Sequence, residues 1–175
     1  NEALKLALAS LGRTDLNPKE HDELRYIAAC CYHFLHDPKT AVGMLRECIV
    51  YLRSQDRPQA LINVLNACSA ALTEINEYEE ALAYSHEALE VASLLGNPLS
   101  YASTQYILAD LLTTFGDYGK AEELLLESRT LLERLNPMGA LVDCNVYLST
   151  LYQSWLSPHS SVLAHKYAAH ALETA

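Results

Sequence analysis

Glycine, proline and aromatic residues are scarce in this chain of 175 residues. It contains 6 Gly and 6 Pro, and aromatic residues make up 8% of it, whereas 50% of its residues are hydrophobic. Alanine and leucine are frequent instead. Few helix breakers and many helix formers favour an all-α protein, and a chain of this length can bury roughly 70% of its unfolded surface.

A long apolar run is also missing. No stretch approaches the roughly 18 apolar residues of a membrane span, and no basic and apolar leader opens the chain. We therefore expect a soluble protein without a membrane partner. The cysteines are odd in number and lie inside helical patterns, where they act as small core residues: Cys30, Cys31, Cys48, Cys68 and Cys144. This usage favours the reducing cytoplasm.

Motifs that carry catalysis or bind cofactors are absent. The sequence has no Gly-rich phosphate loop, no HExxH and no CxxC. Cys30, His33 and His36 are spaced by three, but they lack carboxylate partners and His36 falls at a loop, so a core cysteine and boundary histidines explain them better than zinc. The same residues lack a third group to orient an imidazole for nucleophilic catalysis. We expect no enzyme, no metal and no cofactor.

Positive charge is missing from a third of the chain. Residues 58–119 contain no Lys or Arg but eight acidic residues, within a net charge of −10. Such a surface repels phosphate backbones, so we expect no direct nucleic-acid binding. Two interpretations stay open. The acids solvate outward faces and helix N-termini, as Glu77, Glu79 and Glu80 do around Tyr78, or they attract a basic partner.

The stretch from Pro98 to Pro137 contains two runs of apolar residues at helical spacing, separated by Gly116 and Asp117. Glycine accepts the left-handed conformation that ends a helix, and aspartate can cap the next one. The stretch therefore predicts two antiparallel amphipathic helices joined by a tight turn. Neither helix can bury its apolar face within one hairpin, so neighbouring copies must cover it.

Copies of this hairpin recur with a period of 40 residues. Prolines suit the first turn of each first helix, at Pro18, Pro58 and Pro98, with Pro137 one residue short of the next step. Small residues that let helix axes approach closely form three series: Ala29, Ser69, Ala109, Ser149; Ala41, Ala81, Ala121, Ser161; and Cys48, Ala88, Ser128, Ala168. A bulky series is expected to plug the end of each first helix: Leu35, Ile75, Phe115, Trp155.

This pattern resembles the tetratricopeptide repeat, with small residues at motif positions eight, twenty and twenty-seven and an aromatic at seventeen (Tyr78, Tyr118). The usual period is 34, and the extra residues add about one helical turn. Long-helix variants of this kind occur in sensory and scaffolding regions of bacterial regulators. The motif's tryptophan is absent, and HEAT-type helical pairs are the alternative fold. The resemblance implies an all-α, right-handed α-solenoid of antiparallel helix hairpins.

The predicted organisation is one continuous solenoid domain from a longer protein. Residues 1–11 are interpreted as the trailing helix of a truncated preceding repeat, and four repeats follow over residues 18–56, 57–96, 97–136 and 137–175. The last repeat matches the motif least, because His165 stands where the motif prefers a large apolar residue.

The resemblance also implies a concave groove lined by the first helices. Carried over by motif position or its neighbour, the expected groove residues are Glu23, Tyr26, His33, Asn63, Asn66, Thr73, Glu74, Ser103, Tyr106, Asp110, Thr113, Asp143 and Gln153. The same motif positions also fall on Cys30, Ala70, Val146 and Thr150. Asparagine offers the donor and the acceptor that an extended peptide backbone needs, and tyrosine offers rigid apolar area with a polar tip. The alternative is a hydrated groove whose polar residues serve only to keep the protein soluble.

Two functions follow from this groove. The first is a protein- or peptide-interaction module in a larger regulatory or scaffolding protein. The second is a ligand-sensing or dimerising domain, and thus a possible homo-oligomer, that controls an attached enzymatic or DNA-binding domain. Chaperone-binding members of the family hold a terminal carboxylate with Lys, Arg and Asn, whereas this groove has no inward Lys or Arg. We therefore expect a neutral or basic partner.

Overall fold

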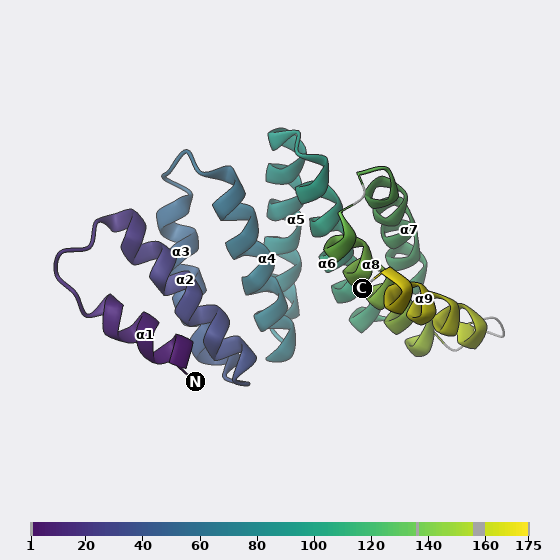
Figure 1. The fold of residues 1–175 in the computed structure, drawn as a ribbon, viewed down its shortest axis with the longest axis horizontal. Coiled ribbons are helices and arrows are strands. Elements are labelled where there is room, and N and C mark those ends of the chain that lie inside the picture. Colours follow the sequence, from purple (N-terminus) through teal and green to yellow (C-terminus); the bar gives the residue numbers. More distant parts are fainter. Residues whose placement is uncertain (1, 136, 156–159, 175) are drawn as a thin grey trace. The chain divides into compact units, whose positions relative to one another are not determined.

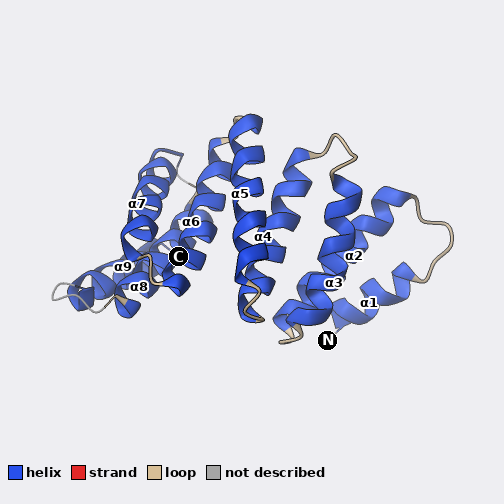
Figure 2. Cartoon of the chain, turned by 180° about the vertical axis from the view of Figure 1, so that it is seen from behind, coloured by secondary structure: helices blue, strands red, loops and turns tan. Residues whose placement is uncertain are grey.

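The computed structural model describes residues 2–135, 137–155 and 160–174. Within these residues the chain forms helices joined by loops, and no strand occurs among them (Figures 1 and 2). The helices are α1 (Glu2–Leu11), α2 (Pro18–Phe34), α3 (Pro38–Leu52), α4 (Pro58–Glu74), α5 (Tyr78–Leu95), α6 (Pro98–Phe115), α7 (Tyr118–Leu135), α8 (Met138–Ser154) and α9 (Ser160–Thr174). The predicted all-α class is confirmed.

The helix starts follow the chemistry of the sequence. Pro18, Pro58 and Pro98 occupy the first turn of their helices, where a missing amide hydrogen leaves no bond unmade. Asn17 caps α2 through a capping box with Glu20, whose amide lies 3.0 Å from Asn17 Oδ1. Pro137, in contrast, is the N-cap of α8. That helix therefore begins at residue 138, 40 residues after the start of α6, although its proline precedes the helix by one residue.

Three helix ends share one backbone conformation at 40-residue spacing. Gly116 ends α6 with φ of 80°, as its type predicts, and His36 and Asn76 adopt φ of 60° and 63° at the corresponding places. Each is followed by an amide that donates back to the helix, with distances of 3.0 Å for Asp37 N to Tyr32 O, Glu77 N to Leu72 O and Asp117 N to Leu112 O. The backbone therefore repeats this helix end every 40 residues, although only one of the three residues is glycine.

The helices gather in two compact units, residues 1–88 and 89–175, and the division falls within α5. In the N-terminal unit, α1 packs on α2, α2 on α3 and α3 on α4, and α2 also contacts α4 (Figure 1). In the C-terminal unit, α6 packs on α7, α7 on α8 and α8 on α9, and α6 also contacts α8. Within each unit, a first helix thus touches its own partner helix and the next first helix.

Small residues lie at the helix contacts of the first three hairpins. Nine of them are at most 1% exposed: Ala29, Ala41, Cys48, Ser69, Ala81, Ala88, Ala109, Ala121 and Ser128. The serines bond to the neighbouring backbone, because Ser69 Oγ donates to Ala81 O at 2.9 Å and Ser128 Oγ donates to Ala102 O at 2.7 Å. Large leucines and isoleucines fill the space between these contacts. The predicted close approach of the helices is confirmed here.

The register predicted for the last helix is wrong by one residue. Ser161 is exposed and Ala168 is only half-buried, whereas the buried residues of α9 are Ser160, Ala164, Tyr167 and Ala171. This set follows the buried set of α7 (Ala121, Leu125, Ser128, Leu132) at a step of 39. The reason lies in Tyr167, whose ring stands where α7 has a serine and stacks on Tyr152 with centroids 5.7 Å apart.

The bulky series does not plug the helix ends as predicted. Leu35 and Phe115 are 46% and 47% exposed, because both lie at the helix boundary where the chain turns outward. Trp155 is the member that packs, stacking on Tyr118 and Tyr152 with centroids 5.8 Å and 6.4 Å away. Separately, no helix among the described residues has the length and apolarity to cross a membrane.

We expect Ala121→Leu to destabilise the chain by roughly 1–3 kcal/mol, because Ala121 is fully buried at the α6–α7 contact and added methylenes overpack such a site. Chemical denaturation followed by circular dichroism measures the change. Glu123→Leu on the same helix is the matched control, because Glu123 is exposed. Equal losses from the two variants would contradict the helix register.

Candidate functional site

Two pairs of side chains join α2 to α4 on the face that carries the predicted groove residues of the N-terminal unit. His33 Nε2 lies 2.8 Å from Glu74 Oε1, and Arg57 Nη2, just before α4, donates to Glu23 Oε1 at 2.8 Å. Both carboxylates are about half-exposed. The structure therefore brings His33 and Glu74 together, and the carboxylates of Glu23 and Glu74 both have partners within this unit.

Asn63, Asn66 and Thr73 lie on α4 with different exposure. Asn63 is exposed and its Oδ1 accepts from Gln59 Nε2 at 3.1 Å, whereas Asn66 is buried, with 8% exposure. Thr73 Oγ1 donates to Ser69 O of its own helix at 2.9 Å. Of the two asparagines, Asn63 therefore presents the more accessible side-chain amide.

A pocket of about 170 Å³ opens beside these residues. It is lined by residues from α2, the end of α3 and the start of α4: Asp22, Glu23, Tyr26, Leu52, Arg57, Ala60, Asn63 and Val64. Three of them, Glu23, Tyr26 and Asn63, are predicted groove residues. Asp22 and Arg57 were not predicted. Asp22 lies on a first helix but at a position that the motif does not assign to the groove, and Arg57 precedes α4. The available signal for Asp22 was a single aspartate at a helical position that faces the interior.

A stacked pair of tyrosines occupies the corresponding face of the C-terminal unit. Tyr106 on α6 and Tyr147 on α8 have ring centroids 5.3 Å apart and an interplanar angle of 26°. Tyr106 is buried, with 8% exposure, and its hydroxyl interacts with Ser103 and Asp143. Sequence reasoning chose the neighbouring Val146 and missed Tyr147. Val146 is 48% exposed.

Two carboxylates border this tyrosine pair. Burial raises the pKa of Tyr147 to about 12, and the negative charges of Asp110 and Asp143 act in the same direction. Burial also raises the pKa of Asp110 above its ordinary value. No described residue forms a hydrogen bond or an ion pair with the Asp110 carboxylate. We call Tyr106, Tyr147, Asp110 and Asp143 the acidic tyrosine patch.

The other predicted residues of the C-terminal unit bond locally. Thr113 is buried and its Oγ1 donates to Ala109 O at 2.8 Å, while the exposed Gln153 donates from Nε2 to Ser149 Oγ at 3.2 Å. Neither joins the acidic tyrosine patch through a hydrogen bond. Ser103 does join it, through Tyr106.

The acidic stretch from residue 58 to 119 is partly neutralised by arginines of α3. Arg46 forms two hydrogen bonds with Glu80, and Arg53 donates to Glu87 at 2.9 and 2.6 Å. Glu74 is similarly engaged by His33. These glutamates therefore support contacts within the N-terminal unit, whereas the half-buried Asp110 has no such partner among the described residues.

The cysteines and histidines form no evident chemical centre. Among the described residues, no three His, Cys, Asp or Glu side chains gather as metal ligands. All five cysteines are free thiols, and burial raises the pKa of Cys68 and Cys144 to about 12. Such thiols carry little thiolate at neutral pH.

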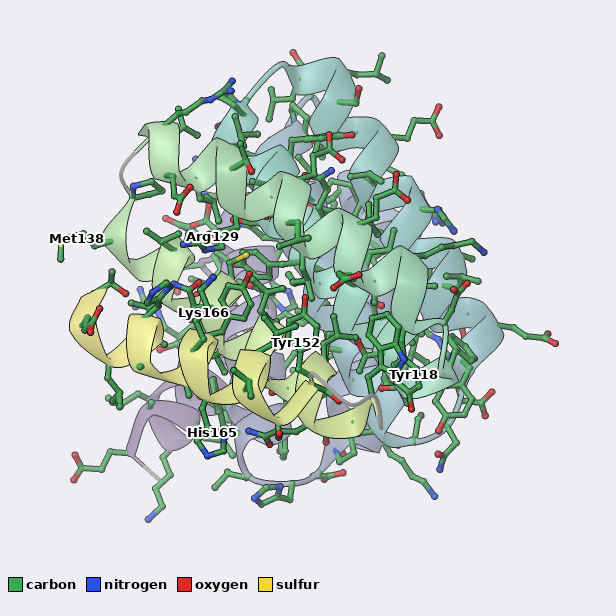
Figure 3. All side chains as sticks on the ribbon, turned by 90° about the vertical axis from the view of Figure 1, so that its right-hand side faces the viewer. Tyr118, Arg129, Met138, Tyr152, His165 and Lys166 are labelled. Atoms are coloured by element: carbon green, nitrogen blue, oxygen red, sulfur yellow. The ribbon has the colours of Figure 1, made fainter. Side chains whose placement is uncertain are left out.

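A larger pocket of about 720 Å³ lies between α8 and α9. Tyr152 and Trp155 line it from α8 and its end, and Ala164, His165 and Ala168 line it from α9. In Figure 3, which looks onto α9, Tyr118 and Tyr152 lie on one side of this helix and His165 lies on the other. This pocket lies in the hairpin whose second helix, α9, has the shifted register.

Comparison with known proteins identifies the fold. The family model of the tetratricopeptide repeat matches residues 60–134. The chain has a tetratricopeptide repeat fold. This confirms the predicted resemblance and decides against HEAT-type pairs. No curated protein sequence matches the chain.

Solved structures with tetratricopeptide-like folds are similar over nearly the whole chain. A Rap protein complexed with competence and sporulation factor matches with a TM-score of 0.83 at 17% identity, over 98% of this chain and 47% of that protein. PlcR of Bacillus thuringiensis, complexed with the peptide PapR7 and DNA, matches with 0.82 at 14%, over 99% and 64%. BtubC from P. vanneervenii matches with 0.73 at 15%, over 99% and 71%. The chain thus spans less than two thirds of Rap and PlcR.

We expect Asp110→Asn to raise the melting temperature at pH 7 by about 2–4 °C, the shift that ~1 kcal/mol causes at this size. The pKa of Asp110 is higher in the folded chain, so its ionised form opposes folding once the pH exceeds that value. The gain should shrink as the pH falls toward 3.8, where the unfolded chain also takes up the proton.

Thermal unfolding between pH 3.5 and 8 tests this expectation. Asp143→Asn is the matched control, because it removes the same charge from the same patch at an exposed position. An equal gain from both variants would show that burial of Asp110 is not the cause.

Proposed function

We propose that the chain is a protein-interaction module that holds an extended, neutral or basic partner segment on the predicted groove faces. The observation that carries this proposal is the acidic tyrosine patch, where two stacked tyrosines are bordered by two carboxylates. The groove positions carried over from the family contain no Lys or Arg to neutralise it. A partner must therefore bring the cation.

The chemistry of the patch favours an arginine or lysine side chain. A guanidinium or ammonium group is attracted by the negative face of a tyrosine ring, and a charge-assisted hydrogen bond to a carboxylate is stronger than a neutral one. The half-buried carboxylate of Asp110 has lost hydration without gaining a partner. A bound cation would offset that cost, whereas an acidic segment would increase it.

The N-terminal unit would contribute polar contacts to the partner's backbone. Asn63 is exposed at the edge of the pocket that Tyr26 also lines, and an amide side chain can both donate to and accept from a peptide group. Glu23 stays about half-exposed despite its bond to Arg57. Asn66, Thr73 and Thr113 would act mainly through packing and local bonds, since they are buried or bonded within their own helices.

A regulatory role within a larger protein is the second candidate. Two similar structures are complexes, one of Rap with competence and sporulation factor and one of PlcR with a peptide and DNA. These complexes support the use of this fold to bind a factor or a peptide, and the chain spans 47% and 64% of those proteins. In that role the same groove would sense a ligand or dimerise and control an attached output domain.

We expect basic and neutral peptides to bind and acidic peptides with a free carboxyl terminus not to bind measurably. Isothermal titration calorimetry with basic, neutral and acidic libraries of one length measures this. Affinity for the basic set should fall with salt, because exposed charges are screened over about 10 Å at 0.1 M. Asp110→Asn with Asp143→Asn should weaken it about tenfold, which equals ~1.4 kcal/mol.

The control for this experiment is Glu123→Gln with Glu133→Gln, which removes two negative charges from α7 outside the patch. Tight binding of the acidic set, unchanged by the two aspartate substitutions, would refute the proposed partner chemistry. Equal weakening by the control pair would attribute the effect to net charge alone.

A further inference from the structure

A buried carboxylate in the small pocket of the N-terminal unit has one oxygen without a hydrogen-bond partner among the described residues. Asp22 on α2 is 3% exposed, and its Oδ1 accepts no hydrogen bond from any described residue. Arg25, one turn further along α2, is engaged by Glu47 at 3.1 Å. A buried oxygen in this state loses its hydration without gaining a hydrogen bond, so a ligand that donates to it would relieve a cost already present in the fold.

A buried donor without an acceptor lines the same pocket. Arg57 donates from Nη2 to Glu23 at 2.8 Å, which holds its planar guanidinium in one orientation. Its Nη1 is also buried and has no acceptor among the described residues. Both residues line the pocket, and each has one buried polar atom, an acceptor on Asp22 and a donor on Arg57, that no described residue uses.

Apart from Glu23, which accepts from Arg57, the rest of the lining is apolar or neutral. Leu52, Ala60 and Val64 supply aliphatic walls and Tyr26 supplies an aromatic one. The volume of about 170 Å³ exceeds the roughly 30 Å³ that one water molecule occupies. A small planar group with one polar end fits this lining better than a single water does.

We propose that this pocket accepts a primary carboxamide, whose NH2 group donates to Asp22 Oδ1 and whose oxygen accepts from Arg57 Nη1. This proposal deepens the proposed function and rests on it for the source of the group, an Asn or Gln side chain of the partner segment. It assigns the N-terminal unit a sequence preference that backbone contacts alone do not give.

Other polar groups match the pocket less well. A carboxylate can accept from Arg57, but it offers no donor to Asp22 and adds negative charge beside Asp22 and Glu23. An ammonium group can donate to Asp22, but it has no acceptor for Arg57 and adds a positive charge next to it. A carboxamide carries its donor and its acceptor on two separate atoms and is neutral.

Nuclear magnetic resonance titration of the full chain with propionamide, propionate and propylammonium tests the site directly. We expect propionamide to shift the amide signals of pocket residues such as Tyr26 and Val64, and the two charged probes to leave them unchanged at the same concentration. Equal shifts with all three probes, or none with propionamide, would overturn the proposal.

Substitutions then identify the contacts. Asp22→Asn and Arg57→Lys should each weaken propionamide binding at least fivefold, whereas Asp56→Asn, which removes an exposed charge outside the lining, should leave it unchanged. Unchanged binding in both pocket variants would refute the assignment. If either variant does not fold, the comparison of the three probes on the unsubstituted chain still decides.

Peptides separate this inference from the function on which it rests. Within the basic peptides that bind, replacing each Gln by Glu should weaken binding at one position, and Asp22→Asn should abolish that difference. If basic peptides bind without any Gln preference, the carboxamide pocket fails and the interaction module stands. If propionamide binds but no peptide does, the proposed function fails and the pocket remains a carboxamide site.

Discussion

The close approach of paired helices is the constraint on which the rest of this structure depends. It requires small side chains at fixed places, and nine of these residues are at most 1% exposed in the first three hairpins. Where helices come this close, a serine can bond directly to the backbone of its neighbour, as Ser69 and Ser128 do. The hydroxyls of these two serines are therefore satisfied by the backbone directly, within their own hairpins.

That packing leaves one face of each first helix available for other chemistry. In the N-terminal unit this face is bridged by pairs between α2 and α4, and Asp22 and Arg57 keep unused polar atoms between them. In the C-terminal unit the same face carries stacked tyrosines and acidic residues. The two units thus use one backbone design to present different surfaces, one donor- and acceptor-rich and the other aromatic and acidic.

The fold could be read from the sequence because its determinants are local and periodic. Three local signals favour the same series of helical hairpins. They are alanine and serine at 40-residue spacing, prolines in first turns, and Gly116 at a helix end. The left-handed conformations of His36 and Asn76 escaped this reading, because their side chains do not demand such a backbone. The register of α9 escaped it as well, since Tyr167 shifts the helix by packing against Tyr152.

The candidate site was predictable only in outline. Motif positions selected Glu23, Tyr26 and Asn63, which do share a pocket, but the same rule selected Val146 in place of Tyr147 and passed over Asp22 and Arg57. Which of two neighbouring residues enters a groove depends on a few tens of degrees of helix rotation. Whether a carboxylate such as that of Glu74 is available depends on a histidine 41 positions away. Neither quantity is encoded in spacing.

The one-residue shift of the last hairpin also bears on how such a chain can grow or be rebuilt. The first three hairpins share a 40-residue phase, with small residues at matching buried places, so any of them could in principle be duplicated without disturbing the phase of its neighbours. The hairpin of α8 and α9 steps by 39 at its second helix and places a tyrosine where the others have a small residue. A hairpin packed against it would therefore have to complement a tyrosine in place of a small residue.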